Sequence, residues 1–456
     1  MHVKYKFLGL SAVASLIVFF IMFANGFDQK MSMTAGLTVL IAMLWMTEAM
    51  PIPVTSLIPF FAFPMAGVMT YQDASSSLGS HVILLLMGGF MLSKSLEKSG
   101  VHRRLAVYML KLTGASNAKR LVLGFMLTSA VLSMWISNTA TCLMLLPIAL
   151  AIISSVSNPT LASAILLGIA YAASIGGVGT PIGTPPNIIF MSVYQQTTGT
   201  ELSFLDWMKT GIPVVLLAIP VMALWLTRNL GIIPEVVLPQ TGEWKPAEKR
   251  VLVSFLIIAL AWVFRPFWTE WLNMPFVSDS TIAIAGVVMM CLIPDGDKEK
   301  PGQILDWDTA AQIPWGLLMV YAGGICLAKA FSVSGLSVVL GNALTDLSVL
   351  PIMLLILVLC LAVSFVTEVT SNTATATLLM PILASAAVAL DIDPIVLMMP
   401  AAISASCAFM LPVATPTNTI VYGSGHIDMK TMVREGTILN ILVAFVVTGV
   451  VIVTRL

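Results

Sequence analysis

Apolar segments long enough to cross a bilayer follow one another along almost the whole chain. They lie near 7–24, 33–49, 53–70, 80–98, 161–196, 206–227, 251–268, 279–293, 313–335, 395–424 and 437–454. About 20 such residues span a bilayer core as a helix, and a helix pairs its own backbone N–H and C=O groups where no water can. The pattern predicts an all-α polytopic membrane protein with eleven transmembrane helices.

The composition agrees with a lipid bilayer as the surroundings. Of 456 residues, 58% are hydrophobic and 10% are charged, which a soluble domain of this size does not tolerate. Lys and Arg balance Asp and Glu at 22 each, so the charge gives no sign of a nucleic-acid partner. Five cysteines without a CxxC spacing indicate neither a zinc site nor disulfides. Residues 1–30 hold the first transmembrane helix rather than a signal peptide, because no cleavage site follows the apolar run.

Two further apolar segments, 119–157 and 349–390, carry a polar tripeptide in the middle. The stretches are "WISNTATCLMLLP" at 135–147 and "VTSNTATATLLMP" at 369–381. Each segment is either two short crossings or one re-entrant hairpin. Since Ser, Asn and Thr are good helix N-caps, each tripeptide is expected to end one half-helix and cap the next. A single tripeptide of this kind often only forms hydrogen bonds between neighbouring helices, but its duplication favours two re-entrant hairpins.

The tripeptides belong to an internal repeat. "GGFMLSKSLEKSG" (88–100) matches "GGICLAKAFSVSG" (323–335), "SNTATCLMLLP" matches "SNTATATLLMP", and "PIGTPPNII" (181–189) matches "PVATPTNTI" (412–420). Three matches in one order at offsets of 235, 234 and 231 indicate a duplication. The N-terminal repeat is assigned to 31–249 and the C-terminal repeat to 250–456.

Basic residues predict the orientation of the chain. Seventeen of the 22 Lys and Arg fall on one side, which places the N-terminus in the cytoplasm and the C-terminus outside a plasma (inner) membrane. Five crossings separate equivalent points, and an odd number inverts the second copy. Inverted-topology repeats are typical of secondary transporters with a site near the bilayer midplane. The first hairpin then faces the cytoplasm and the second faces outside.

The third pair of matching motifs predicts broken helices. Pro185 and Pro186, or Pro416, remove N–H donors and disfavour helix in the preceding residue. We expect unwound backbone near 180–187 and near 412–418. Free carbonyls with Ser, Thr and Asn oxygens suit Na⁺, while half-helix N-termini suit an anion. None of these motifs holds a basic residue, so an anionic substrate needs bound cations beside it.

Two acidic residues leave alternatives open. Glu368, three residues before Ser371, is either a cation ligand or proton carrier or a structural hydrogen-bond acceptor. Glu48 lies at the end of a span, before "MPIP", and is interpreted as interfacial.

The paired "SNTAT" tips, each followed by a Thr-Pro-x-Asn break, resemble the divalent anion/sodium symporter family, the sodium-coupled dicarboxylate and citrate carriers. The resemblance extends from "WMTEAMPIPVTSLIPF" (45–60) to the last span. It implies eleven transmembrane helices and two re-entrant hairpins, a homodimer, and an elevator in which a transport domain slides against a scaffold.

The resemblance also implies roles for individual residues. For sodium (Na⁺, the coupling ion) it points to two sets: Ser133, Ser137, Asn138 and the Gly183 carbonyl, and Thr367, Thr370, Asn372 and the Ala414 carbonyl. For the substrate carboxylates it points to residues of both tips and both breaks: Ser137, Asn138, Thr139, Ser371, Asn372, Thr373, Thr184 and Thr415.

The predicted function is sodium-coupled uptake of C4-type dicarboxylates such as succinate, malate or fumarate, with no organic cofactor. Hydroxyl and amide donors also suit tricarboxylates or sulfate, and a sodium-independent dicarboxylate or citrate exchanger of the same fold stays open. An intramembrane enzyme is disfavoured because no HExxH or nucleophile–base arrangement is present. A channel is disfavoured because opposed midplane hairpins favour alternating access.

Overall fold

The computed structural model is built from helices. It describes residues 3–114, 117–156, 158–231, 240, 242–343 and 351–456. Within these ranges it has 23 helices and a single isolated β-bridge, between Pro294 and Gln303. The ends of the two predicted hairpin segments at 157 and 349–350 lie outside the described residues.

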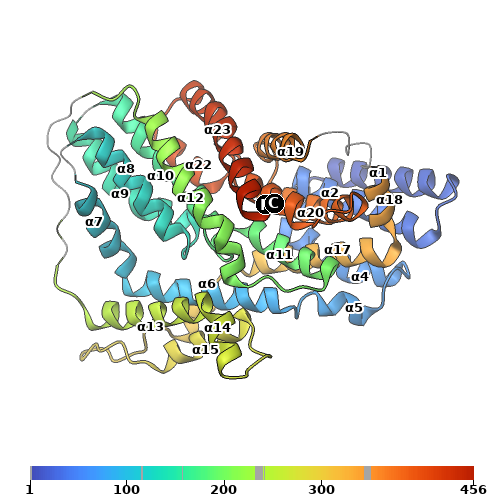
Figure 1. The fold of residues 1–456 in the computed structure, drawn as a ribbon, viewed down its shortest axis with the longest axis horizontal. Coiled ribbons are helices and arrows are strands. Elements are labelled where there is room, and N and C mark those ends of the chain that lie inside the picture. The colour runs from blue at the N-terminus through green and yellow to red at the C-terminus, as the bar shows by residue number, and fades with distance from the viewer. Residues whose placement is uncertain (1–2, 115–116, 157, 232–239, 241, 344–350) are drawn as a thin grey trace.

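The N-terminal helices and two helices of the second half pack together on one side of the molecule (Figure 1). These are α1 (Tyr5–Ala24), α2 (Gln29–Thr47), α3 (Ile52–Thr55), α4 (Ile58–Met65), α5 (Tyr71–Ser76), α17 (Trp315–Ser334) and α18 (Leu336–Ala343). A second group packs around one long helix at the lower edge of Figure 1. It comprises α6 (His81–Ser99), α13 (Pro246–Val263), α14 (Arg265–Trp271), α15 (Asp279–Leu292) and α16 (Trp307–Ala310).

A third group forms the body that carries the polar tripeptides, which we call the tip body. It consists of α8 (Ala118–Ser133), α9 (Asn138–Val156), α10 (Pro159–Val178), α11 (Pro185–Thr198), α12 (Phe204–Leu226), α19 (Ile352–Thr367), α20 (Asn372–Ala389), α21 (Ile395–Ala405), α22 (Pro416–Gly423) and α23 (Met429–Arg455). Its two halves interlock, because α9 and α10 contact α22 while α11 contacts α20 and α21. Such reciprocal contacts join the two sequence repeats in one core.

Nine described helices are long and apolar enough to cross a membrane, or ten if α13 and α14 count as one bent span. Two of the nine, α9 and α20, belong to the predicted hairpin segments, so seven of the eleven predicted crossings are among them. The other predicted crossings are short or interrupted. The segment near 53–70 divides into α3 and α4, and α15 has only 14 residues. The predicted span at 251–268 bends by 75° between α13 and α14, where Pro266 lacks the N–H that would continue the hydrogen bonds of α13.

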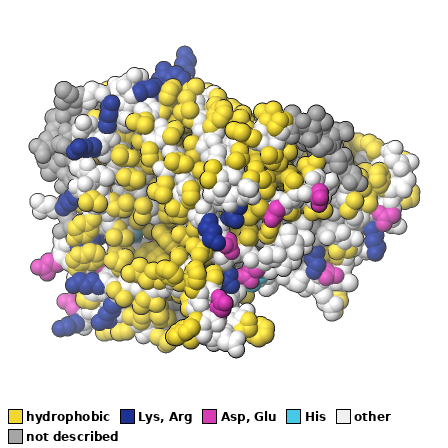
Figure 2. Space-filling view, viewed as in Figure 1, with side chains coloured by type: hydrophobic (Ala, Val, Ile, Leu, Met, Phe, Trp, Pro, Cys, Tyr) yellow, Lys and Arg dark blue, Asp and Glu magenta, His cyan; other side chains and the backbone are white. Residues whose placement is uncertain are grey.

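Hydrophobic side chains cover much of the surface shown in Figure 2, and Lys and Arg lie along its left and upper margins and in smaller groups at the centre and right. Large apolar side chains are exposed on α1, α12 and α13, including Phe20, Leu224 and Leu256. A water-exposed helix would bury such residues, so these faces suit contact with lipid.

Helix α7 (Val101–Thr113) was not anticipated from the sequence, although its buried apolar residues recur at helical spacing. Its Arg104 forms a buried ion pair with Glu248 of α13, at 3.0 Å, and donates to the carbonyls of Gly242 and Glu243. These bonds fix the start of α13 to α7.

Helix α10 lies almost wholly buried against α8 and α9, and small residues allow that approach. A Cβ on Gly176 would lie 2.3 Å from the Ala130 carbonyl oxygen and 2.4 Å from its Cα, so the backbones of α8 and α10 nearly touch. At Gly168, a Cβ would lie 3.0 Å from Cγ of the flexible Met126 side chain.

We therefore expect Gly176→Ala to destabilise the protein far more than Gly168→Ala. The first substitution forces two backbones apart, and overpacking of this kind costs roughly 1–3 kcal/mol or more, whereas Met126 can change rotamer. The thermal unfolding midpoint of each variant in detergent, detected by fluorescence size-exclusion chromatography, measures the difference in stability. Equal midpoints for the two variants would contradict the close packing of α8 on α10.

Candidate functional site

The two tripeptides and the two helix breaks meet in one cavity of about 260 Å³. Its walls include all eight residues that the sequence assigns to substrate: Ser137, Asn138, Thr139, Ser371, Asn372, Thr373, Thr184 and Thr415. Gly183 and Ala414, whose carbonyls are assigned to sodium, line the same cavity. None of the described residues that line it carries a charge. The polar contacts open to a ligand are therefore hydroxyls, amides and backbone groups.

The first tip is formed where α8 ends at Ser133 and α9 begins at Asn138. Ser137 accepts a hydrogen bond from the backbone N–H of Ala140 at 3.2 Å, which confirms the predicted N-cap. The buried Ser133 hydroxyl donates to Oδ1 of Asn138. Asn138 is thus oriented by a residue of the preceding helix.

The first break runs from Gly179 to Thr184, between α10 and α11. It includes the predicted 180–184, but helix α11 resumes at Pro185 rather than beyond 187. It folds back so closely that a Cβ on Gly177 would lie 2.9 Å from the Gly183 carbonyl oxygen and 3.0 Å from Oδ1 of Asn138. Two oxygens from separate elements therefore converge where Gly177 lacks a side chain. With Ser133 they form an all-oxygen donor set, which fits a hard cation such as Na⁺.

The second tip repeats this arrangement with one difference. Thr367, at the end of α19, donates to Oδ1 of Asn372 at 2.9 Å, as Ser133 does to Asn138. Ser371 precedes α20 but makes no side-chain cap, so the predicted capping holds for the first tip alone. The Thr370 hydroxyl bonds to the Val366 carbonyl and to Thr375.

The second break runs from Ser406 to Thr415, between α21 and α22. It includes the predicted 412–415 but starts earlier, and helix α22 resumes at Pro416 rather than beyond 418. Thr415 caps α22 by accepting from the N–H of Asn418 at 3.2 Å. The Thr184 hydroxyl of the first break lies 3.3 Å from that of Ser406. The two breaks thus touch each other beside the cavity.

Glu368 holds the second break in place. Its carboxylate accepts from the backbone N–H groups of Phe409, Met410 and Leu411 at 2.6–3.0 Å, and from Asn440 Nδ2 at 2.8 Å. Both carboxylate oxygens are used in this way. The geometry therefore supports Glu368 as a structural hydrogen-bond acceptor rather than as a cation ligand or proton carrier. Glu48, in contrast, is exposed at the end of α2 in a left-handed conformation with φ of 45°.

Twelve residues of the cavity wall were not assigned to the site from the sequence, among them Phe90, Ser93, Trp135 and Ser174. Ser93 lies in the repeated segment 88–100, which was the available signal. Phe90 and Ser93 come from α6 and Leu317 comes from α17, both outside the tip body, so the cavity lies where all three groups of helices meet.

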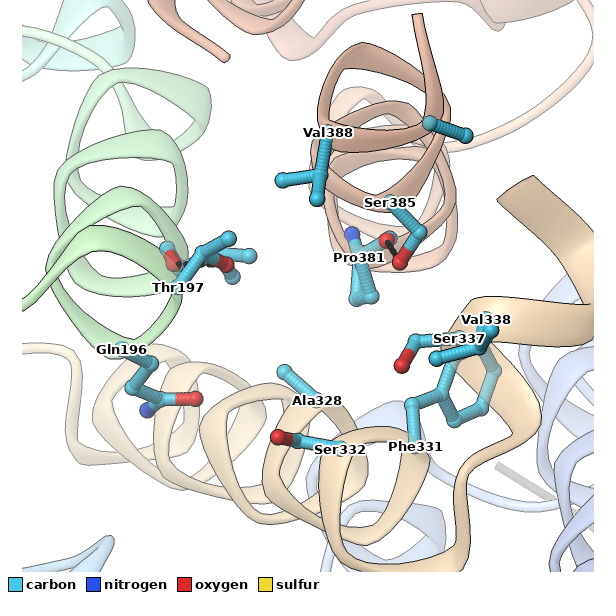
Figure 3. Close-up of a pocket in the computed structure, with 12 residues that line it drawn as sticks. Gln196, Thr197, Ala328, Phe331, Ser332, Ser337, Val338, Pro381, Ser385 and Val388 are labelled. Carbon is cyan, nitrogen blue, oxygen red and sulfur yellow. Dashed lines mark hydrogen bonds between the residues drawn. The ribbon is translucent and has the colours of Figure 1, made fainter. Parts of the chain in front are cut away.

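Two other cavities adjoin the tip body. One, of about 690 Å³, shares Thr139, Ser371 and Thr415 with the first cavity and extends to Trp45 and Glu48 at the end of α2. The other, of about 340 Å³, lies between α11, α17, α18 and α20 (Figure 3). Its polar residues are Gln196, Thr197, Ser332, Ser337 and Ser385, and it contains none of the tip residues.

The fold and the cavity define a class: a polytopic membrane transporter with a polar, uncharged site enclosed by broken helices. The chain matches the family model described as "Citrate transporter" over residues 42–397. It is 38% identical over 450 residues to the sodium-dependent dicarboxylate transporter SdcS of Staphylococcus saprophyticus, covering 94% of this chain and 86% of that one. It is 40% identical over 439 residues to SdcS of Staphylococcus aureus, covering 91% and 84%. The chain belongs to the divalent anion/sodium symporter family and is a transporter rather than an enzyme.

Two solved structures share the fold at low sequence identity. The YdaH transporter of Alcanivorax borkumensis aligns with a TM-score of 0.57 at 14% identity, covering 84% of this chain and 86% of that one. MtrF of Neisseria gonorrhoeae aligns with a TM-score of 0.56 at 12% identity, covering 84% and 82%. These likenesses support the fold alone.

Glu368→Gln is expected to lower the thermal midpoint. An amide NH₂ cannot accept the backbone N–H bonds that one carboxylate oxygen now accepts, and each unsatisfied buried group costs about 1–3 kcal/mol. Glu48→Gln, which removes an exposed carboxylate, serves as the control. Melting of both purified variants in detergent measures the effect, and equal midpoints would remove the structural role of Glu368.

Proposed function

We propose that the protein couples the inward movement of Na⁺ to uptake of C4-type dicarboxylates such as succinate, malate or fumarate. The observation that carries the proposal is the uncharged cavity shared by two Ser-Asn-Thr tips. A dianion in such a cavity meets only neutral donors, so binding requires cations nearby. The relatives named sodium-dependent dicarboxylate transporters support both the ion and the class of substrate.

Two similar sets of donors suit a substrate with a carboxylate at each end. In our proposal Ser137, Asn138 and Thr139, near Thr184, bind one carboxylate. The second tip binds the other through Ser371, Asn372 and Thr373, near Thr415. Each tip stands at the N-terminus of a helix of 18 or more residues, α9 or α20, where the helix dipole favours negative charge.

Sodium occupies two sites in this proposal. The first comprises Ser133, Ser137, Asn138 and the Gly183 carbonyl, and its convergence at Gly177 supports it. The second comprises Thr367, Thr370, Asn372 and the Ala414 carbonyl. Because the Thr370 hydroxyl bonds elsewhere, this residue contributes through its backbone carbonyl. Since Asn138 and Asn372 are shared between sodium and substrate, sodium that binds first orients the amides for the dianion.

We further propose eleven crossings with two re-entrant hairpins, α8–α9 and α19–α20, in inverted repeats at 31–249 and 250–456. The N-terminus is cytoplasmic and the C-terminus outside. The tip body is the transport domain of an elevator, and the other two groups of helices form a scaffold that makes a homodimer. The meeting of α6 and α17 residues with the tips at one cavity supports a sliding boundary there.

Sodium-independent exchange is the alternative, and replacement of the ion distinguishes the two functions. We expect succinate uptake by proteoliposomes to require an inward Na⁺ gradient and to fall to background when K⁺ or choline replaces Na⁺. Citrate and sulfate are tested as competitors of the labelled succinate. Counterflow of equal rate in all three cations would instead establish an exchanger.

Asn138→Ala and Asn372→Ala should each abolish uptake, because each removes an amide that contacts both sodium and substrate in the proposed site. Expression and the elution volume on size exclusion should stay unchanged. Ser385→Ala, in the separate cavity of Figure 3, is the matched control and should transport normally. Sodium-driven uptake at the normal rate in both Asn variants would remove the site assignment.

A further inference from the structure

Two buried asparagines follow the helix breaks and make the same contacts. Nδ2 of Asn187 in α11 donates to the carbonyls of Gly177 and Thr180, at 3.0 and 2.8 Å. Nδ2 of Asn418 in α22 donates to the carbonyls of Ala408 and Leu411, at 2.9 and 3.0 Å. In both cases the acceptors lie 10 and 7 residues before the asparagine. Each side chain therefore ties the resumed helix back across the unwound backbone.

These ties determine the shape of the backbone that carries the proposed sodium carbonyls. Gly183 lies between Thr180 and Asn187, and Ala414 occupies the equivalent place between Leu411 and Asn418. In the first copy the tie ends on Gly177, the residue where the Gly183 carbonyl and Asn138 Oδ1 converge. A change in the length of the tie would displace one of those oxygens relative to the other.

The same two residues also share an unsatisfied group. Oδ1 of Asn187 and Oδ1 of Asn418 are buried and have no hydrogen-bond partner among the described residues. Both side chains are fully buried, with 0% exposure. An unpaired buried acceptor is unfavourable, and it occurs twice at equivalent positions. The negative end of each amide dipole is therefore available to a nearby cation or to a water that a cation holds.

We propose that Asn187 and Asn418 are positioning residues for the two sodium sites, one for each site. They contact backbone rather than the ion, and they set the geometry at which the Gly183 and Ala414 carbonyls face the tips. This inference rests on the proposed function, because it presupposes that sodium binds there. It assigns a part in ion binding to residues outside both sodium sets.

The test compares Asn187→Ala and Asn418→Ala with the unmodified full-length protein. In purified protein without substrate, the Na⁺ concentration that gives half of the thermal stabilisation should rise at least about tenfold in each variant, as is typical when the groups behind metal ligands are removed. Asn187→Ser and Asn418→Ser, whose hydroxyl can donate to one of the two carbonyls, should give intermediate values. The Ser variants also decide the question if the Ala variants do not fold.

The matched control is Asn158→Ala. Asn158 caps the opposite end of α10, where it accepts from the N–H groups of Thr160 and Leu161. Loss of this cap should lower the thermal midpoint without changing the Na⁺ concentration that gives half of the thermal stabilisation. If the substitutions only lowered the general stability of the fold, the Na⁺ concentration that gives half of the thermal stabilisation would stay unchanged in all variants.

The outcomes separate this inference from the proposed function. If the unmodified protein is not stabilised by Na⁺ relative to K⁺, the proposed function fails. If it is stabilised, and folded Ala or Ser variants require the same Na⁺ concentration within twofold, the positioning role is wrong while the proposed function stands. A selective rise in the Asn187 and Asn418 variants, with Asn158→Ala unaffected, supports it.

Discussion

Unpaired backbone in the middle of a membrane protein is the constraint on which this structure depends. A helix that breaks there exposes N–H and C=O groups, each of which costs several kcal/mol if it is left unsatisfied in hydrocarbon. The two breaks, 179–184 and 406–415, therefore survive only inside the tip body, where side chains pair with their backbone. The same groups that make the breaks costly are the ones able to bind ions. The packing that buries the two breaks inside the tip body therefore also forms the cavity.

The sequence predicted the structure best where a residue type determines the backbone conformation of its own segment. Pro185, Pro186 and Pro416 favour the first turn of a helix, and the helix after each predicted break begins at one of them. The duplicated tripeptides likewise predicted which residues meet, and the eight substrate assignments line one cavity. Repetition supplied the evidence here, because two copies of a motif related by one offset are constrained together.

The sequence was least informative where a side chain acts over a long distance in the chain. The partners of Glu368 are backbone N–H groups 41–43 residues away, which no local pattern identifies. The Thr370 hydroxyl bonds to Thr375, one turn into α20, and residue type alone does not predict this contact. The helical spacing of the apolar residues of α7 is visible in the sequence. Its basic residues predicted only the orientation of the chain, not the ion pair of Arg104 with Glu248.

The two repeats hold the unwound backbone of their breaks with different groups. Both asparagine ties are the same, yet the loop before them is held by Glu368 in the second copy and, in the first, by a bond from the Thr180 hydroxyl to the carbonyl of Met134 at 2.5 Å. Gly177 and Gly183 of the first copy correspond to Ala408 and Ala414 of the second, so the first loop folds back more closely. The second loop is longer and depends on a buried carboxylate for three of its N–H groups. The backbone behind the two proposed sodium sites is therefore held by different groups, and this difference is a physical basis for unequal sodium affinities in the proposed mechanism.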